Sequence, residues 1–180
     1  MNITEKKISS KEIYKGKVLH VVEDKIMLPN GKESVREIVH HKGAVCIIPV
    51  TDDGDVICVK QFRYAHGEVV LEVPAGKLEE TDKDPLEAAV RELSEETGAV
   101  AKHIDYLGKL YTSPAILDEV IYMYMATGLT FGETHPDEDE FLEVVKIPLT
   151  RLRDMVMKSE IPDAKTQACV LRAYLKIKGI

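Results

Sequence analysis

Three glutamates near the middle of the chain could together hold a metal ion, and an arginine beside them could orient their carboxylates. Glu92 and Glu96 are four positions apart, so on a helix their carboxylates lie one turn apart on one face. Glu95 borders that face, and like charges at these spacings repel each other. Hard divalent cations such as Mg²⁺ prefer oxygen ligands and would turn this repulsion into binding. Arg91 lies four positions before Glu95, where it can orient the carboxylates without neutralising the cluster.

A solvated acidic helix face is the alternative interpretation of these glutamates, and we expect Glu92 and Glu96 to face solvent. The surrounding residues predict the helix itself. Asp84 is a candidate N-cap, Pro85 suits the first helical position, and Gly98 suits the residue that ends a helix. The helix would turn an apolar stripe towards the core, formed by Leu86, Ala89, Val90 and Leu93.

The segment from Gly76 to Ala99 resembles the Nudix box, whose pattern is G-x5-E-x7-R-E-U-x-E-E-x-G-U with U an aliphatic residue. A β-rich stretch and a Pro-Ala-Gly turn lead into it. Gly76 matches the first glycine, and residues 91–99 match the second half of the pattern. The interval from Gly76 to Arg91 is one position longer than in the pattern, which predicts a one-residue loop insertion. The first Glu of the pattern has no clean counterpart, and residues 82–84 share that stretch.

Within the Nudix family, the chain is most similar to ADP-ribose pyrophosphatases. Arg63 ends a predicted strand, as does an arginine that faces the substrate in those enzymes. Pro114 lies sixteen residues after Gly98, a spacing typical of members that hydrolyse ADP-ribose. Ala115 departs from the usual Ser-Pro-Gly, which affects the shape of that loop. Further similar segments are the acidic loop at 137–144 and the start of the last helix at 163–166.

This resemblance implies Mg²⁺-dependent hydrolysis of the pyrophosphate bond of ADP-ribose, or of a related nucleoside diphosphate sugar, to AMP and ribose 5-phosphate. Mn²⁺ is an alternative metal. The implied metal ligands are the backbone carbonyl of Ala75 and the side chains of Glu92, Glu96 and Glu140. The implied catalytic residues are Glu138 as general base, Glu95 and Arg91. The implied substrate contacts are Arg36, Glu37, Arg63 and Glu119.

Other functions remain open at this point. Glu138 and Glu140 both precede a strand on a loop, so their spacing alone does not decide which one reaches the attacking water. A Nudix enzyme could instead hydrolyse a dinucleoside polyphosphate or a nucleoside triphosphate. A non-catalytic Nudix module that only binds nucleotide is a third possibility, although such modules tend to lose the box glutamates that are intact here.

The composition excludes several other classes of protein. The 180 residues include 24 Lys plus Arg and 31 Asp plus Glu, a net charge of −7, which argues against coating nucleic acid or an anionic membrane. No apolar run approaches the length of a membrane span, and the first residues lack the apolar stretch of a signal peptide. Cys46, Cys58 and Cys169 are widely spaced and form no CxxC pair. We therefore expect a cytoplasmic protein.

Strands outnumber helices in the predicted order of elements and do not alternate strictly with them. Strands are expected at 18–28, 34–40, 44–50, 56–62, 69–73, 104–111, 120–127 and 141–147. Besides the helix after Asp84, two helices are expected near 149–158 and 163–177. This order predicts an α/β fold with a mixed (α+β) sheet, and the resemblance implies the Nudix fold, an α/β/α sandwich with an N-terminal antiparallel hairpin.

We expect residues 1–42 to form a separate strand region and residues 43–180 to form the Nudix hydrolase domain. Asn30-Gly31 marks the turn of the N-terminal hairpin. An isolated hairpin is marginally stable in water, so it should pack on something larger or on another chain. The resemblance implies a homodimer whose N-terminal strands cross to the partner, with Tyr14, Val18 and Leu19 lining the neighbour's adenine site.

Overall fold

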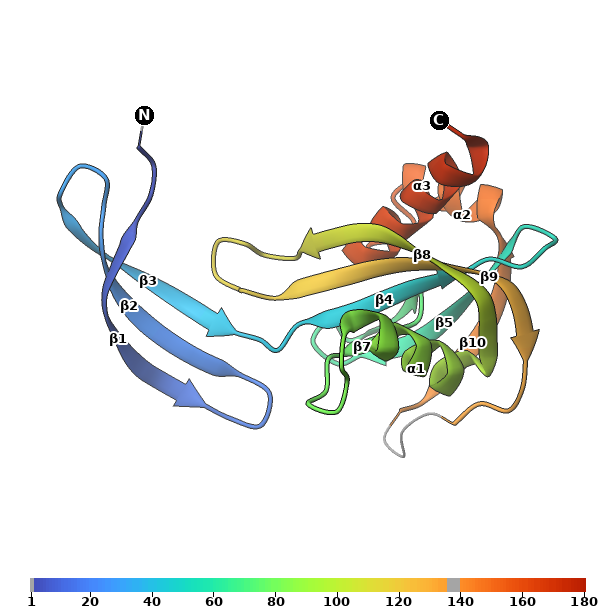
Figure 1. Cartoon of the computed structure of the whole chain (residues 1–180), viewed down its shortest axis with the longest axis horizontal. Helices are drawn as coiled ribbons and strands as arrows, with labels where there is room; N and C mark the ends of the chain where they lie inside the picture. The colour runs from blue at the N-terminus through green and yellow to red at the C-terminus, as the bar shows by residue number, and fades with distance from the viewer. Residues whose placement is uncertain (1, 136–139) are drawn as a thin grey trace. The chain divides into compact units, whose positions relative to one another are not determined.

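The computed structural model describes residues 2–135 and 140–180, which fold as two compact units (Figure 1). The first unit comprises Met1–Gly43 and Tyr111–Val120. The second comprises Ala44–Leu110 and Ile121–Ile180. Among the described residues, no helix is long and apolar enough to cross a membrane.

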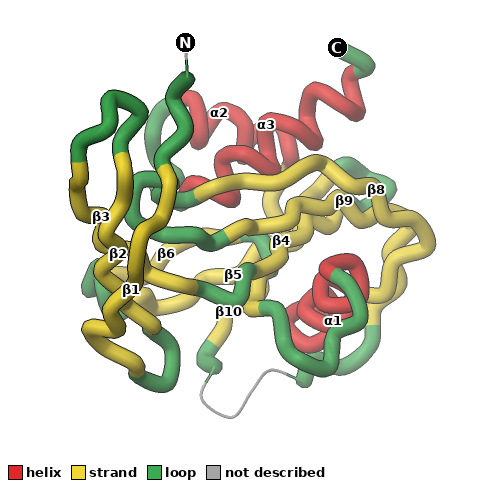
Figure 2. The backbone as a smooth tube through the Cα atoms, turned by 60° about the vertical axis from the view of Figure 1, so that its left-hand side comes forward, coloured by secondary structure: helices red, strands yellow, loops and turns green. Residues whose placement is uncertain are grey.

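The first unit is built on a three-stranded antiparallel sheet in the order β1-β2-β3 (Figure 2). Its strands are β1 (Lys6–Lys15), β2 (His20–Met27) and β3 (Glu33–His40). The predicted hairpin is therefore confirmed, with Gly31 at φ 80° in its turn. Strand β1 was not predicted, because it is exposed along its whole length and its sequence lacks an alternating apolar face.

The central strand β2 buries one face of the small sheet. Val22, Asp24 and Ile26 alternate along it and are all buried. The ammonium group of Lys7, 2.8 Å away, and the hydroxyl of Ser10, 2.5 Å away, bind the Asp24 carboxylate and lower its pKa. Lys7 and Ser10 of strand β1 thus stabilise the buried charge of Asp24 on strand β2.

The segment 111–120 belongs to this first unit because it bonds to the end of β3. The Val39 amide donates to the Ile116 carbonyl at 2.7 Å, and the Asp118 amide donates to the Val39 carbonyl at 3.2 Å. The carbonyl of Ser113 accepts from the Leu117 amide at 2.9 Å, which closes the turn around Pro114.

The second unit contains two sheets. One has the order β7-β4-β9-β8 and the other β10-β5-β6. Strand β4 pairs with β9 in parallel and with β7 in antiparallel, so the predicted mixed sheet is confirmed. The strands are β4 (Ala44–Pro49), β5 (Asp55–Arg63), β6 (Glu68–Glu72), β7 (Ala75–Lys77), β8 (Ala99–Tyr111), β9 (Val120–Phe131) and β10 (Leu142–Pro148).

Helices cover both faces of the sheet that contains β4. They are α1 (Pro85–Thr97), α2 (Leu149–Met157) and α3 (Ala164–Lys178). Val45 and Ile47 pack in one apolar cluster with α1 residues, whereas Cys46 and Ile48 pack in another with α2 and α3 residues. Alternate side chains of one strand thus reach opposite helical layers, which Figure 1 shows on either side of the sheet. The predicted α/β/α sandwich is confirmed.

The ends of α1 lie where its capping residues predict. The Asp84 side chain accepts a hydrogen bond from the Glu87 amide at 2.9 Å. Gly98 ends the helix with a φ of 66°, and its amide donates to the Ser94 carbonyl. The turn predicted at Pro-Ala-Gly before the helix was wrong. Ala75 instead begins the short strand β7, in which it pairs with Cys46.

Candidate active site

The carboxylates of Glu92 and Glu96 lie on the inner face of α1, beside strand β7. Only 8% of Glu92 and 4% of Glu96 is exposed, so the expectation that both face solvent was wrong. Strand β7 covers them: the Ala75 amide donates to Glu96 Oε2 at 3.3 Å, and a Cβ on Gly76 would lie 1.8 Å from Glu92 Oε1. The glycine is therefore needed for the close approach of the strand to the helix.

Burial changes the protonation of both groups. It raises the pKa of Glu92 to about 7, although Arg91 opposes the shift. Burial, together with the neighbouring charges of Glu92 and Glu140, raises the pKa of Glu96 to about 8. The three carboxylates therefore repel one another in a site that water cannot fully screen. A bound cation would lower the free energy of the ionised form.

Arg91 links the carboxylates of the helix to the loop that precedes it. Its Nη1 donates to Glu92 at 2.8 Å and to Glu95 at 3.0 Å, and its Nη2 donates to the Lys77 carbonyl at 3.3 Å. Desolvation alone would lower the pKa of Arg91, but Asp82 and the glutamates raise it. Arg91 thus contacts the glutamates that we expect it to orient.

Asp82 is a functional candidate that the sequence analysis missed. Its two carboxylate oxygens accept from Nε and Nη2 of Arg91, each at 3.3 Å, and one of them accepts from the Glu79 amide at 2.8 Å. These bonds lower the pKa of Asp82, the one to Arg91 most. Five residues separate Gly76 from Asp82, so Asp82 occupies the place of the first Glu in the Nudix pattern. The extra residue therefore lies between Asp82 and Arg91.

The donor set fits a hydrated divalent cation. Among residues 2–135 and 140–180, no three His, Cys, Asp or Glu side chains converge closely enough to enclose a metal by themselves. Mg²⁺ does not need such a cage, because it keeps several waters and binds through one or two carboxylates. Two buried carboxylates of raised pKa, next to the backbone of Ala75, meet that requirement.

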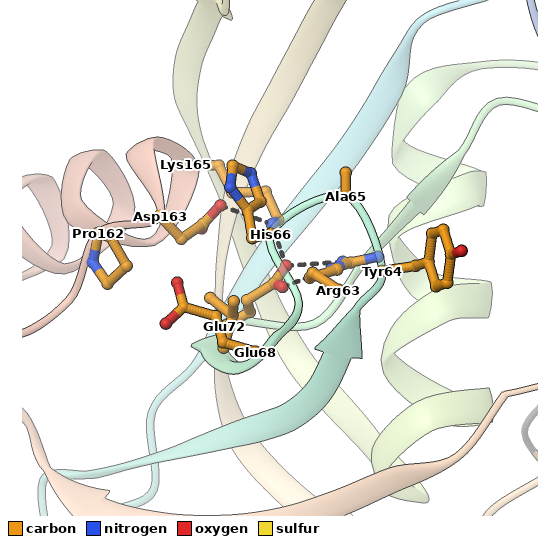
Figure 3. A pocket seen from close by; sticks show the side chains of 10 residues that line it. Arg63, Tyr64, Ala65, His66, Glu68, Glu72, Pro162, Asp163 and Lys165 are labelled. Atoms are coloured by element: carbon orange, nitrogen blue, oxygen red, sulfur yellow. Dashed lines mark hydrogen bonds and ion pairs between the residues drawn. The ribbon is translucent and has the colours of Figure 1, made fainter.

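Arg63 lies at the end of β5, beside a pocket of about 460 Å³ (Figure 3). Its Nε and Nη2 donate to the two oxygens of Glu72 at 2.6 and 2.7 Å. These bonds raise the pKa of Arg63, and the charge of Glu96 adds a smaller contribution. The charges of Arg63 and Glu96 therefore interact. The pocket is lined by Arg63, Tyr64, Ala65, His66, Glu68, Val70, Glu72, Pro162, Asp163 and Lys165.

The other predicted substrate contacts lie in the first unit. Arg36 and Glu37 are neighbours on β3, so their side chains point to opposite faces of that sheet. Arg36 forms an ion pair with Glu5. Glu119 lies on segment 111–120, where it accepts from the Thr112 hydroxyl at 2.9 Å.

Of the two glutamates of the acidic loop, the structure describes only Glu140. Its charge acts on both Glu92 and Glu96. The predicted base, Glu138, lies outside the described residues.

Comparison with known proteins gives matches along nearly the whole chain. The profile of the NUDIX domain matches residues 40–172, and that of the nucleoside diphosphate sugar hydrolase N-terminal domain matches residues 5–39. An ADP-ribose pyrophosphatase of Bacillus subtilis is 42% identical over 98% of this chain and 95% of its own. A methanol dehydrogenase activator of Bacillus methanolicus is 38% identical over 97% of this chain and 94% of its own.

A solved structure titled as an ADP compounds hydrolase has the same fold. It superposes with a TM-score of 0.84, covering 99% of this chain and 98% of its own, at 22% sequence identity. Nudix hydrolases generally need a divalent metal ion, which suits the buried carboxylates of α1. The family predicted from the box residues is confirmed: the chain belongs to the Nudix hydrolase family.

Proposed function

We propose that this enzyme hydrolyses the pyrophosphate bond of ADP-ribose, or of a closely related nucleoside diphosphate sugar, to AMP and ribose 5-phosphate. The observation that carries the proposal is the pair of buried carboxylates, Glu92 and Glu96, of which Glu96 interacts electrostatically with Arg63. A pyrophosphate is an anion that such a site can accept only together with a cation. The near full-length relative named ADP-ribose pyrophosphatase supports this choice of substrate.

The metal would be Mg²⁺, with Mn²⁺ as an alternative. Glu92, Glu96, Glu140 and the carbonyl of Ala75 would hold it, and when bound it would neutralise phosphate charge and acidify a water. Arg91 would keep Glu92 and Glu95 in fixed positions through the bonds described above.

The chain itself would supply the proton transfer. We assign the general base to Glu138, and general-base catalysis of this kind contributes about 10²–10⁴-fold. Glu95 would share a ligand role or position a metal through water. Replacing Glu138 by Gln should lower kcat whatever the Mg²⁺ concentration. The corresponding change at Glu140 should raise the Mg²⁺ requirement and be partly rescued by extra Mg²⁺.

Four charged residues would contact the substrate. Arg63 would meet a phosphate, because its guanidinium carries five N–H donors and Glu72 takes only two of them in a bidentate pair. Arg36 would meet a phosphate or the terminal ribose, while Glu37 and Glu119 would accept hydrogen bonds from adenine or ribose.

We further propose that the enzyme is a cytoplasmic homodimer. Strand β1 exposes Ile8, Ile13 and Tyr14, which a second copy of the chain could cover. Three buried cysteines without a disulfide suit a reducing compartment. Sedimentation equilibrium at micromolar concentration tests the dimer, and a fully active species of 20.2 kDa, the mass of one chain, would refute it.

A substrate panel with product identification tests the proposed reaction. Purified protein with Mg²⁺ should hydrolyse ADP-ribose with a higher kcat/KM than any nucleoside triphosphate, and AMP should appear with ribose 5-phosphate. A preference for a triphosphate, with release of pyrophosphate, would contradict the proposed substrate. Binding of ADP-ribose without turnover would instead indicate a nucleotide-binding module.

A further inference from the structure

We propose that Lys165, on the first turn of α3, is a positioning residue for Arg63 and acts through the carboxylate of Glu72. The inference rests on the proposed function, in which Arg63 binds a phosphate of the substrate. The proposal gives a role in the reaction to helix α3, whose other described role is to pack in the apolar core.

The Glu72 carboxylate lies between two cations. One edge receives the Nε and Nη2 of Arg63, at 2.6 and 2.7 Å, and Lys165 Nζ donates to Oε2 of the same group. Asp163 accepts a second bond from Lys165 at 3.0 Å. These four side chains carry two positive and two negative charges, and Figure 3 shows their contacts as a chain that runs from Arg63 through Glu72 and Lys165 to Asp163.

The network is buried at its centre and open at one end. Glu72 is 2% exposed and the Lys165 side chain 12%, whereas 40% of the Arg63 side chain is exposed. A buried carboxylate held from two sides cannot rotate without losing a charged hydrogen bond. The buried Glu72 carboxylate therefore holds the exposed Arg63 guanidinium in a fixed orientation.

Helix α3 is a firm support for this arrangement. Asp163 caps the helix by accepting from the Thr166 amide at 2.8 Å. The buried Thr166 hydroxyl accepts from the Val73 amide at 2.9 Å, so the same turn also holds the backbone next to Glu72. Two adjacent residues of α3 thus fix the side chain of residue 72 and the backbone of residue 73, just before Ala75.

Loss of the lysine should loosen Arg63 without removing it. In Lys165→Met the aliphatic stem still fills its space, but the carboxylate keeps only one of its two cationic partners. Glu72 and Arg63 could then rotate together, and fewer molecules would present the guanidinium to the phosphate. The expected result is a rise in KM for ADP-ribose, with kcat less affected.

A double-mutant cycle tests the coupling. Arg63→Gln should lower kcat/KM by about 100-fold and Lys165→Met by about tenfold, whereas in the Arg63→Gln background Lys165→Met should cost less than about twofold. Lys178→Met removes the same charge from an exposed position on the same helix, and it should leave kcat/KM unchanged. A tenfold loss from Lys165→Met in both backgrounds would overturn the proposal, because a merely structural role is additive.

A second measurement follows Arg63 directly and needs no turnover. The Nε–Hε NMR signal of Arg63, identified by its loss in Arg63→Gln, should show a high heteronuclear NOE in the native protein and a clearly reduced one in Lys165→Met. An unchanged NOE would overturn the proposal. If Lys165→Met fails to fold, Asp163→Asn serves instead, because Asn still caps the helix but pairs weakly with Lys165; it should shift the NOE in the same direction.

These readouts separate the two hypotheses. Arg63→Gln with undiminished kcat/KM would refute the phosphate-binding role of Arg63, and with it the catalytic value of positioning it. A protein that hydrolyses no nucleoside diphosphate sugar but shows the NOE change would contradict the proposed function alone.

Discussion

Glu72 and Glu96 are both buried carboxylates, but their pKa values are shifted in opposite directions. Glu72 is 2% exposed, and burial raises its pKa, but Arg63 and Lys165 more than offset this, so that its pKa lies below the usual value. Glu96 is 4% exposed, and its pKa is raised to about 8. Burial is therefore not what distinguishes them.

The difference lies in the surrounding charges. Glu72 has two cations in contact, whereas Glu96 accepts from the Ala75 amide and has the carboxylates of Glu92 and Glu140 nearby. A carboxylate whose charge is compensated by cations in contact holds those cations in a fixed orientation. An undercompensated carboxylate, which has no such cations and lies near other carboxylates, favours binding of an external cation. The comparison explains why one site suits positioning and the other suits metal binding.

The largest expected effect is on catalysis. Glu92→Gln or Glu96→Gln removes a charge needed to hold the metal, and kcat should fall by at least about 100-fold in steady-state assays with Mg²⁺. Glu87→Gln makes the same change at an exposed position on the same helix and should retain near-native kcat. Near-native activity of either site variant would show that the metal assignment is wrong.

The comparison also predicts opposite effects on stability. Glu72→Gln leaves two cations without their buried carboxylate, which should lower the free energy of unfolding by about 3–5 kcal/mol. Glu96→Gln removes a repulsive charge, and at pH 8.5 it should stabilise the metal-free protein. Urea unfolding in the presence of a chelator measures both. Equal destabilisation by the two changes would contradict the assigned difference.

The pH dependence of stability follows from the raised pKa values. Between the ordinary value of 4.5 and about 8, the folded protein keeps a proton on Glu96 that the unfolded chain has released. The unfolded state thus binds fewer protons, so the stability of the metal-free protein should fall as the pH rises through this window. Unfolding curves at pH 5.5, 7 and 8.5 should show this decline, and in Glu96→Gln it should be smaller. A stability that rises over the same window in both proteins would contradict the raised pKa of the buried Glu96 carboxylate.

The smallest effect is expected at Asp82. Asp82→Asn keeps the shape of the side chain but weakens its hold on Arg91, which still bonds Glu92 and Glu95. We expect a loss of about three- to tenfold in kcat, with the larger part of the stability retained. Asp84→Asn, which preserves the helix cap, is the matched control. A loss as large as that of Glu92→Gln would place Asp82 in the metal site itself.

Much of the fold could be predicted from local signals. The ends of α1 follow from Asp84, Pro85 and Gly98, and the doubly buried strand β4 follows from its continuous apolar run. Strand β1 escaped prediction because its side chains are exposed on both faces, so no alternation marks it. Strand β7 was not predicted because three residues are too few to show the alternation of a strand. Its pairing with β4 is a tertiary contact that the local sequence does not indicate.

The active-site residues were predictable as a set, but their environment was not. The spacing of Glu92 and Glu96 placed them on one face, yet the backbone that buries them comes from Ala75 and Gly76 on a different element. Lys165 lies 93 positions from Glu72, and no local pattern links the two. Asp82 is the exception, because counting from the first glycine of the box would have found it.

The most direct test of the undercompensated site is the number of protons released when metal binds. Calorimetric titration of metal-free protein with Mg²⁺ or Mn²⁺, in buffers of different ionisation enthalpy, gives that number. At pH 7 about one proton or more should be released per molecule, falling towards zero above about pH 9, because metal binding requires both glutamates to be ionised. In Glu92→Gln and Glu96→Gln the metal affinity and the proton release should both drop. Tight metal binding at pH 7 without proton release, or unchanged binding in these variants, would contradict the account.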